Sequence, residues 1–275
     1  MKKVLRSTIC VALCVVLVML ASCASKKDSK ETTIIVFAAA SMKETLTQVA
    51  DAYRAENPNV TILLNFESSG TLKTQIEEGS NCDLFISAAP KQMNELDVSK
   101  DAELNPNAND FVEQGTRLNL LENKVVLVVP DGNPKNITDF ADFAERLESG
   151  QILLAMGNSD VPVGQYTQKI FAYFGLDEEQ IAGDGAISYG SNVKEVTTQV
   201  KEGSVDCGVI YATDAFSAEL TVIDKAAAEM CGQVIYPAAV MKTENTDAAK
   251  AFLAYLQTDE SMKIFESVGF TSAVQ

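Results

Sequence analysis

Histidine is absent from the 275 residues of this chain. Without it no Ser–His or Cys–His nucleophile pair can form, and no imidazole can serve as a general base or a metal ligand. Basic residues are also few, because 22 lysines and arginines stand against 38 aspartates and glutamates, a formal net charge of −16. Nucleic acids and anionic membranes are bound by clustered cations, so this balance argues against either as the partner.

The cysteines form no metal or redox motif. Six are present, and the three that lie beyond the N-terminal segment are Cys82, Cys207 and Cys231. None of these has the C-x-x-C spacing that zinc sites and redox centres use. Cys82 and Cys207 each begin an apolar run, which predicts that they are buried. The sequence leaves open whether two of the three form a disulfide.

The N-terminal segment lacks an apolar run long enough for a membrane span. Three basic residues precede the run at residues 11–20, a pattern typical of a secretory signal. The run ends in Leu20-Ala21-Ser22-Cys23, which resembles the bacterial lipoprotein cleavage box. The resemblance implies that residues 1–22 are a signal peptide, that Cys23 carries the lipid, and that residues 23–32 are a flexible tether. An ordinary secretory signal with a chance cysteine is the alternative.

The body of the chain has the composition and periodicity of an α/β protein. Hydrophobic residues make up 47% and charged residues 22%, and the length allows one large domain or two of ordinary size. Short β-rich runs alternate with helical patterns, which is typical of mainly parallel sheets flanked by helices. Strands are predicted at residues 33–37, 60–66, 83–87, 125–129, 152–155, 209–211 and 234–241. Helices are predicted to begin near Ser41, Gly70, Thr138, Pro162 and Asn192, with two more at residues 247–256 and 259–267.

Two segments about 125 residues apart repeat one pattern. Residues 71–80 and residues 193–204 each combine a helical pattern with a Glu-Gly-Ser turn, and each leads into a buried strand. Two ordinary α/β units that share the same turn chemistry would explain the likeness. Two similarly built lobes, each aiming the N-terminus of a helix at a shared cleft, would explain it as well.

Hydroxyl- and glycine-rich junctions stand where four of the predicted helices begin. The first turn of a helix has free backbone N–H groups and a partial positive charge, so it can bind an anion without a cationic side chain. One junction alone can be a simple cap, and Ser41 with Glu44 has the spacing of a capping box. Four junctions on an α/β frame predict an anion or a small polar ligand in a cleft between lobes. The junctions are Ala40-Ser41, residues 67–70, residues 161–164 and residues 191–193.

Six motifs in order along the chain resemble the periplasmic molybdate-binding proteins of ABC importers. The resemblance covers nearly the whole mature chain and continues to Ile264–Phe270. The motifs are Val36-Phe-Ala-Ala-Ala-Ser41, Phe66-Glu-Ser-Ser-Gly-Thr71, Asp83-Leu-Phe-Ile-Ser-Ala88, Met156-Gly-Asn-Ser-Asp-Val-Pro-Val-Gly164, Gly208-Val-Ile-Tyr-Ala-Thr-Asp-Ala215 and Tyr236-Pro-Ala-Ala-Val240.

The resemblance implies a two-lobed periplasmic-binding-protein fold of type II, in which each lobe is a mainly parallel sheet flanked by helices. Residues 33–121 together with residues 238–275 would form lobe I, and residues 122–237 would form lobe II. A two-strand hinge would join the lobes, and we place its strands at residues 125–129 and 234–241.

The resemblance also implies an oxyanion held by hydroxyl groups and backbone amides. Carried over position by position, the ligand contacts are Ser41, Ser69, Val163, Val193 and Tyr211. The two valines would act through their backbone N–H groups and Tyr211 through its phenol. The sequence departs from the family at Gly70, where serine is often seen, and at Val163, where alanine is common. Both departures bear on selectivity.

The function implied is that of a solute-binding lipoprotein that captures molybdate, and tungstate as well, and delivers it to an ABC permease. It would be an extracytoplasmic monomer, held at the cell membrane by its lipid, on the periplasmic side or the outer face of the cytoplasmic membrane, and it would need no cofactor. Donors without acceptors suit an anion that carries no proton at neutral pH. We interpret the nearby Asp83, Asp160 and Asp214 as structural groups or rim charges.

Three alternatives remain. The same fold could bind another solute, such as sulfate or a small organic anion. A ferric site would want paired tyrosines, and the sequence places only Tyr211 suitably. An enzyme without histidine would need carboxylates or a Ser–Lys pair, and no close pair of that kind occurs at the junctions.

Overall fold

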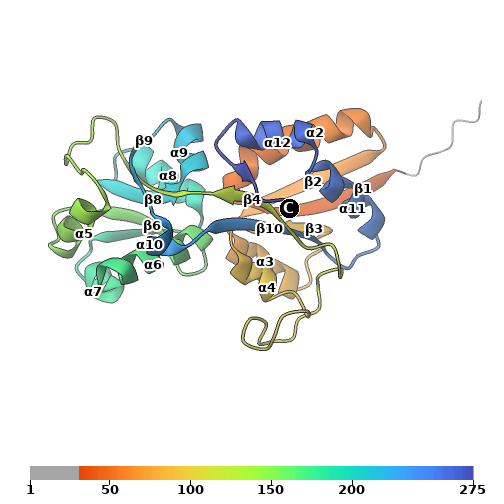
Figure 1. Cartoon of the computed structure of the whole chain (residues 1–275), viewed down its shortest axis with the longest axis horizontal. Coiled ribbons are helices and arrows are strands. Elements are labelled where there is room, and N and C mark those ends of the chain that lie inside the picture. Colours follow the sequence, from red (N-terminus) through yellow and green to blue (C-terminus); the bar gives the residue numbers. More distant parts are fainter. Residues whose placement is uncertain (1–30, 275) are drawn as a thin grey trace, which may run out of the picture. The chain divides into compact units, whose positions relative to one another are not determined.

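The computed structural model describes residues 31–274, which form two β-sheets with helices packed against them (Figure 1). The predicted signal peptide, the lipid attachment at Cys23 and residues 23–30 of the tether lie outside the described residues. The first sheet has the strand order β11-β4-β10-β3-β1-β2. Its strands are β1 (Thr32–Ala39), β2 (Val60–Glu67), β3 (Leu84–Ile86), β4 (Leu118–Asn123), β10 (Val234–Val240) and β11 (Thr271–Ser272).

The second sheet is built from the middle of the chain and has the order β7-β6-β8-β5-β9. Its central strand β8 and its neighbour β5 are buried along their whole length, which explains why both appear in the sequence as continuous apolar runs. The strands are β5 (Val125–Val129), β6 (Leu154–Gly157), β7 (Ile187–Gly190), β8 (Cys207–Tyr211) and β9 (Thr221–Lys225).

Helices that cover each sheet come from the same parts of the chain as its strands (Figure 1). Around the first sheet these are η1 (Ala40–Met42), α2 (Lys43–Glu56), α3 (Ser69–Glu77), α4 (Pro90–Asn94), α11 (Thr246–Tyr255) and α12 (Asp259–Glu266). Around the second they are α5 (Phe140–Glu148), α6 (Pro162–Phe174), α7 (Glu178–Gly183), α8 (Val193–Lys201), α9 (Ala212–Ala218) and α10 (Ala228–Cys231).

Both sheets are mixed, whereas the sequence predicted mainly parallel ones. Strands β2, β1 and β3 run parallel in the first sheet, and β7, β6 and β8 in the second. Strands β10 and β4 are antiparallel to their neighbours, as are β5 and β9. These four strands flank the two passages of the chain between the sheets, an arrangement that local periodicity does not reveal.

The chain passes between the two sheets twice. Strand β4 ends at Asn123 and β5 begins at Val125, so Lys124 alone separates strands of different sheets. The return runs from β9 through α10 into β10 (Figure 1). The two predicted hinge strands exist almost as predicted, but each pairs only within its own sheet. The crossings therefore lie immediately before these strands, at Lys124 and in the segment that contains α10.

The predicted capping box at Ser41 is wrong. Ser41 lies in the 3₁₀ turn η1, and no side chain caps α2, which begins at Lys43. The Ser41 hydroxyl instead lies 2.9 Å from the hydroxyl of Tyr236, a residue of β10. A partner 195 positions away decides the role of this serine, and no local pattern could indicate it.

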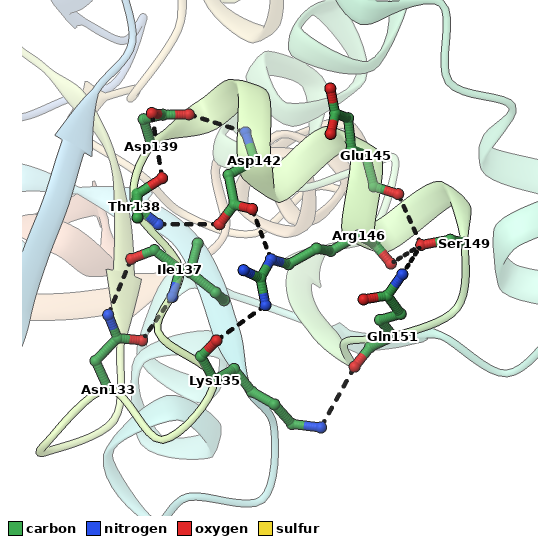
Figure 2. A network of polar contacts seen from close by, with 10 residues as sticks. All are labelled: Asn133, Lys135, Ile137, Thr138, Asp139, Asp142, Glu145, Arg146, Ser149 and Gln151. Atoms are coloured by element: carbon green, nitrogen blue, oxygen red, sulfur yellow. Dashed lines mark hydrogen bonds and ion pairs between the residues drawn. The ribbon is translucent and has the colours of Figure 1, made fainter.

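The cap of α5 is one residue later than predicted. Asp139, and not Thr138, accepts a hydrogen bond from the backbone N–H of Asp142, over 2.8 Å (Figure 2). The Asp142 carboxylate in turn accepts from the N–H of Thr138 and from Arg146. This reciprocal pair satisfies the start of the helix as a capping box does. By contrast, Pro162 at the start of α6 and Asn192 as the cap of α8 are confirmed.

The three cysteines of the described chain are free and buried. Burial raises the pKa of the Cys82, Cys207 and Cys231 thiols, which keeps them protonated and unreactive. The predicted burial of Cys82 and Cys207 is confirmed, and the three form no disulfide with one another. Within residues 31–274 no helix is both long and apolar enough to cross a membrane.

Candidate functional site

All five predicted ligand residues line one small pocket. It lies where η1 and the first turns of α3, α6 and α8 meet the end of β8. These are the four junctions that the sequence singled out, and α3 and α8 are the two helices of the internal repeat. Ser41, Ser69, Val163, Val193 and Tyr211 are each at most 5% exposed. The structure therefore brings together backbone and hydroxyl donors from segments up to 170 residues apart.

The hydroxyl oxygens of Ser69 and its neighbour Ser68 already accept hydrogen bonds from the backbone. The Ser69 Oγ accepts a hydrogen bond from the backbone N–H of Ala88 over 2.9 Å. The neighbouring Ser68 caps α3, since its Oγ accepts from the N–H of Thr71. Because the Ser69 oxygen is occupied as an acceptor, its proton is left to donate toward the pocket.

The two valines stand at helix starts, and no side chain caps the backbone N–H of either. Val163 is in the first turn of α6, which no side chain caps and whose first residue, Pro162, has no N–H. At α8 the Asn192 side chain accepts from the N–H groups of Lys194 and Glu195, which leaves the N–H of Val193 for another acceptor. Both N–H groups lie at the positive end of a helix dipole.

Among the described lining residues, Tyr211 is the one whose buried side-chain polar atom lacks a hydrogen-bond partner. Its hydroxyl is fully buried, and no described residue meets it with hydrogen-bond geometry, although, in addition to burial, the neighbouring Tyr236 contributes to its raised pKa. Burial raises the pKa of this phenol well above its usual value, so it is a neutral donor at physiological pH. An unpartnered buried hydroxyl costs about 1–3 kcal/mol, and a bound acceptor would recover that cost.

No lysine or arginine lines the pocket among the residues that the structure describes there, and Glu67 is its one charged residue. The Glu67 carboxylate lies 3.5 Å from the side-chain amide of Asn192, which belongs to the second sheet's helices. Across residues 31–274 no group of three or more His, Cys, Asp or Glu side chains could hold a metal ion. Apart from the Glu67 carboxylate, the described lining residues offer hydrogen-bond donors without a cationic charge.

Lys194, the cation next to Val193 in sequence, is neutralised by two carboxylates. Its Nζ lies 3.0 Å from Asp214 and 2.7 Å from Glu44, so it joins α8 to α9 and to α2. Burial alone would lower the pKa of Lys194, but Asp214 and Glu44 raise it above its usual value. Burial raises the pKa of Asp214 to about 6, against the opposing effect of Lys194. Asp214 is therefore a buried structural carboxylate and not a rim charge.

The elements of the two sheets touch closely around the pocket. A Cβ built on Gly70 of α3 would lie 2.2 Å from the backbone oxygen of Asp160, which precedes α6. Gln92 of α4 also donates to Gln165 of α6 over 3.3 Å. The departure from serine at position 70 thus has a structural reason, because only glycine allows this approach.

A larger open groove of about 710 Å³ lies between α4 and α6, but none of the five predicted residues lines it.

Two residues behind the small pocket were not predicted to have a role. Tyr236 and Asn123 form a hydrogen-bonded chain to Ser41, and both are buried. Tyr236 belongs to one of the motifs that carry the resemblance, which is the only signal that pointed to it.

The fold and the pocket define a two-lobed solute-binding protein. Residues 34–271 match the family described as bacterial extracellular solute-binding proteins, and the chain belongs to this family. The fold class predicted from the sequence is confirmed, with mixed in place of mainly parallel sheets.

Two relatives match over most of their length. YvgL of Bacillus subtilis (strain 168), whose name assigns it provisionally to the ABC transporter substrate-binding lipoproteins, is 34% identical over 92% of this chain and 94% of its own. The molybdate-binding protein ModA of Escherichia coli (strain K12) is 30% identical over 88% of this chain and 90% of its own. The resemblance to the molybdate-binding proteins is confirmed.

Solved structures share the fold. The periplasmic molybdate-binding protein of Azotobacter vinelandii has a TM-score of 0.73 at 19% identity, over 86% of this chain and 98% of its own. The sulfate-binding protein SubI of Mycobacterium tuberculosis H37Rv has a TM-score of 0.71 at 18% identity, over 88% of this chain and 87% of its own. At these identities the likeness shows the fold and not the ligand.

The raised pKa of Asp214 predicts an unusual pH dependence of stability. A carboxyl group whose pKa is higher in the folded state contributes stability below its unfolded pKa, and this contribution is lost as pH rises through about 6. The difference in unfolding free energy between wild type and Asp214→Asn should fall by on the order of 2–3 kcal/mol between pH 4 and pH 7. Urea unfolding at several pH values measures it.

Asp142→Asn is the control, because the hydrogen bond from Arg146 lowers the pKa of Asp142. The unfolding free energy of wild type minus that of Asp142→Asn should therefore rise with pH, because the contribution of Asp142 to stability is lost as pH falls. A flat difference for Asp214→Asn would show that Asp214 has the same pKa in the folded and unfolded states.

Proposed function

We propose that this protein captures molybdate, and tungstate as well, in the pocket around Ser41 and Tyr211 and delivers it to the permease of an ABC transporter. The observation that carries the proposal is the set of convergent donors with the unpartnered Tyr211 hydroxyl among them. The relatives named for molybdate binding and for ABC transport support it.

Ligand chemistry follows from the donors. The proposed donors are the backbone N–H groups of Val163 and Val193 and the hydroxyl groups of Ser41, Ser69 and Tyr211, all from residues that line the pocket. A fully deprotonated dianion accepts at every oxygen, whereas hydrogen phosphate must also donate a proton. Among the described lining residues, Glu67 is the one carboxylate that could accept such a proton, and one of its oxygens lies 3.5 Å from the Asn192 amide. Because the proposed donors outnumber this one acceptor, the site favours molybdate, tungstate or sulfate over phosphate.

Sulfate is the nearest rival, since it offers the same acceptors on a smaller ion. The size of the pocket must therefore discriminate molybdate from sulfate, because both ions meet the same number of donors. A ferric ligand fits poorly, although Tyr211 and Tyr236 lie with ring centroids 5.8 Å apart. Burial raises the pKa of both phenols, which opposes the phenolate form that iron needs. Catalysis has no support, because no nucleophile is paired with a base at the pocket.

The proposed cycle is one of capture and release. The two lobes, each built on one of the sheets, open and close about the crossings at Lys124 and the α10 segment, and closure around the dianion produces the form that the permease recognises. A monomer without cofactor suffices for this cycle. Lipidation of Cys23 would hold the protein at the outer face of the cytoplasmic membrane, on the residue 23–32 tether.

A thermal-shift panel tests the ligand. Molybdate and tungstate at about 100 times their Kd should each stabilise the protein by about 2.7 kcal/mol through mass action. Sulfate and phosphate at the same concentrations should stabilise it less. Absence of any shift with both molybdate and tungstate would exclude the proposed function, and a larger shift with sulfate would reassign the ligand.

Removal of one hydroxyl should separate binding from folding. Tyr211→Phe removes a hydroxyl that no described residue meets with hydrogen-bond geometry, so the stability without ligand should stay the same or rise. The affinity for molybdate should fall about 10- to 150-fold, the scale of a hydrogen bond to a charged group. Titration calorimetry measures this loss, with Tyr255→Phe as the control because its buried hydroxyl also lacks a partner. Equal affinities for wild type and Tyr211→Phe would remove Tyr211 from the site.

A methyl group at position 70 should oppose closure. Gly70→Ala places Cβ against the Asp160 backbone, and such overpacking costs about 1–3 kcal/mol, which is a 5- to 150-fold loss of molybdate affinity. Alanine favours the helix itself, so the protein without ligand should not lose stability. Gly183→Ala in α7 is the matched control, because its Cβ meets open space. Unchanged affinity in Gly70→Ala would mean that the bound form does not need this contact.

A further inference from the structure

Behind the pocket a chain of buried hydrogen bonds ends at Ser41. The side-chain amide of Asn123 donates to the Tyr236 hydroxyl over 3.2 Å, and that hydroxyl lies 2.9 Å from the Ser41 Oγ. Asn123 also donates to the Thr213 hydroxyl over 2.9 Å. All four residues are at most 5% exposed, so water does not compete for these bonds.

The direction of each bond can be worked out from the donors. The Asn123 Oδ1 accepts from the backbone N–H of Lys124 over 2.8 Å, which turns the NH₂ group toward Tyr236 and Thr213. The Tyr236 oxygen therefore accepts from Asn123, and its own proton needs an acceptor. Two side chains in the described chain meet the Tyr236 hydroxyl with hydrogen-bond geometry, Asn123 and Ser41, and only Ser41 can accept its proton, since the neighbouring Tyr211 hydroxyl does not meet that geometry.

The consequence falls on Ser41. Since its Oγ accepts the Tyr236 proton, its own proton is left over, and Ser41 lines the pocket. We infer that Asn123 and Tyr236 are positioning residues that orient the Ser41 hydroxyl as a donor to the bound oxyanion. Neither of them lines the pocket, so both act through Ser41.

The location of the chain adds a second role. Asn123 is the last residue of β4, directly before the first crossing between the sheets, and Tyr236 lies in β10 just after the second. Thr213 belongs to α9, beside the second sheet. The hydrogen bonds therefore tie a ligand donor to both crossings, and any movement at these crossings changes the donor's orientation.

A double-mutant cycle tests the inference, which rests on the proposed oxyanion function. Molybdate affinity is measured by titration calorimetry for wild type, Tyr236→Phe, Ser41→Ala and the double variant. Ser41→Ala should lose about 10- to 150-fold and Tyr236→Phe about 5- to 50-fold. The double variant should bind like Ser41→Ala within about twofold, because Tyr236 acts only through Ser41.

If Tyr236 had a merely structural role, the fold-losses of molybdate affinity in Tyr236→Phe and Ser41→Ala would multiply in the double variant. Multiplied losses, or wild-type affinity in Tyr236→Phe, would overturn the inference. Tyr255→Phe, whose hydroxyl lies on α11, should bind as wild type. If Tyr236→Phe does not fold, Asn123→Ala replaces it in the same cycle, with the same expectation. Wild type that binds no oxyanion would refute the proposed function instead, so the two failures are distinct.

Discussion

A pocket with no cationic side chain can hold a dianion only through hydrogen bonds and dipoles, and the proposed function depends on this constraint. The first turns of α3, α6 and α8 supply backbone N–H groups, and Ser41, Ser69 and Tyr211 supply protons. Such donors act over the length of one bond, so they must converge closely. The close backbone approach at Gly70 and Asp160 is what brings the two sets together.

The net charge of this protein does not determine whether its pocket can bind an anion. The net charge of −16 is spread over the chain, whereas the pocket has a single carboxylate among its described lining residues. Lys194, which could have supplied a cation beside Val193, is committed to Asp214 and Glu44. Its ion pairs serve to join α8 with α9 and α2. Local dipoles, which formal charge does not count, are left to attract the ligand.

Much of the fold could be predicted because local patterns determine it. Residues 125–129 match β5, and the helix starts at Pro162 and Asn192 follow from the chemistry of the first turn. Apart from the one-residue shift at the start of α5, the failures share one cause. Ser41 was assigned as a cap because its true partner, Tyr236, lies 195 positions away. The mixed sheets and the position of the crossings likewise depend on pairings between distant strands.

The sequence by itself determined the class of protein and five of the residues that line the pocket, since each stands in a local motif at a helix start or strand end. Tertiary structure alone decided how those residues are used. It showed that the Tyr211 hydroxyl lacks a partner, that Gly70 meets the Asp160 backbone, and that Asn123 and Tyr236 stand behind Ser41. These facts depend on contacts between residues far apart in the sequence, and local periodicity carries no information about such contacts.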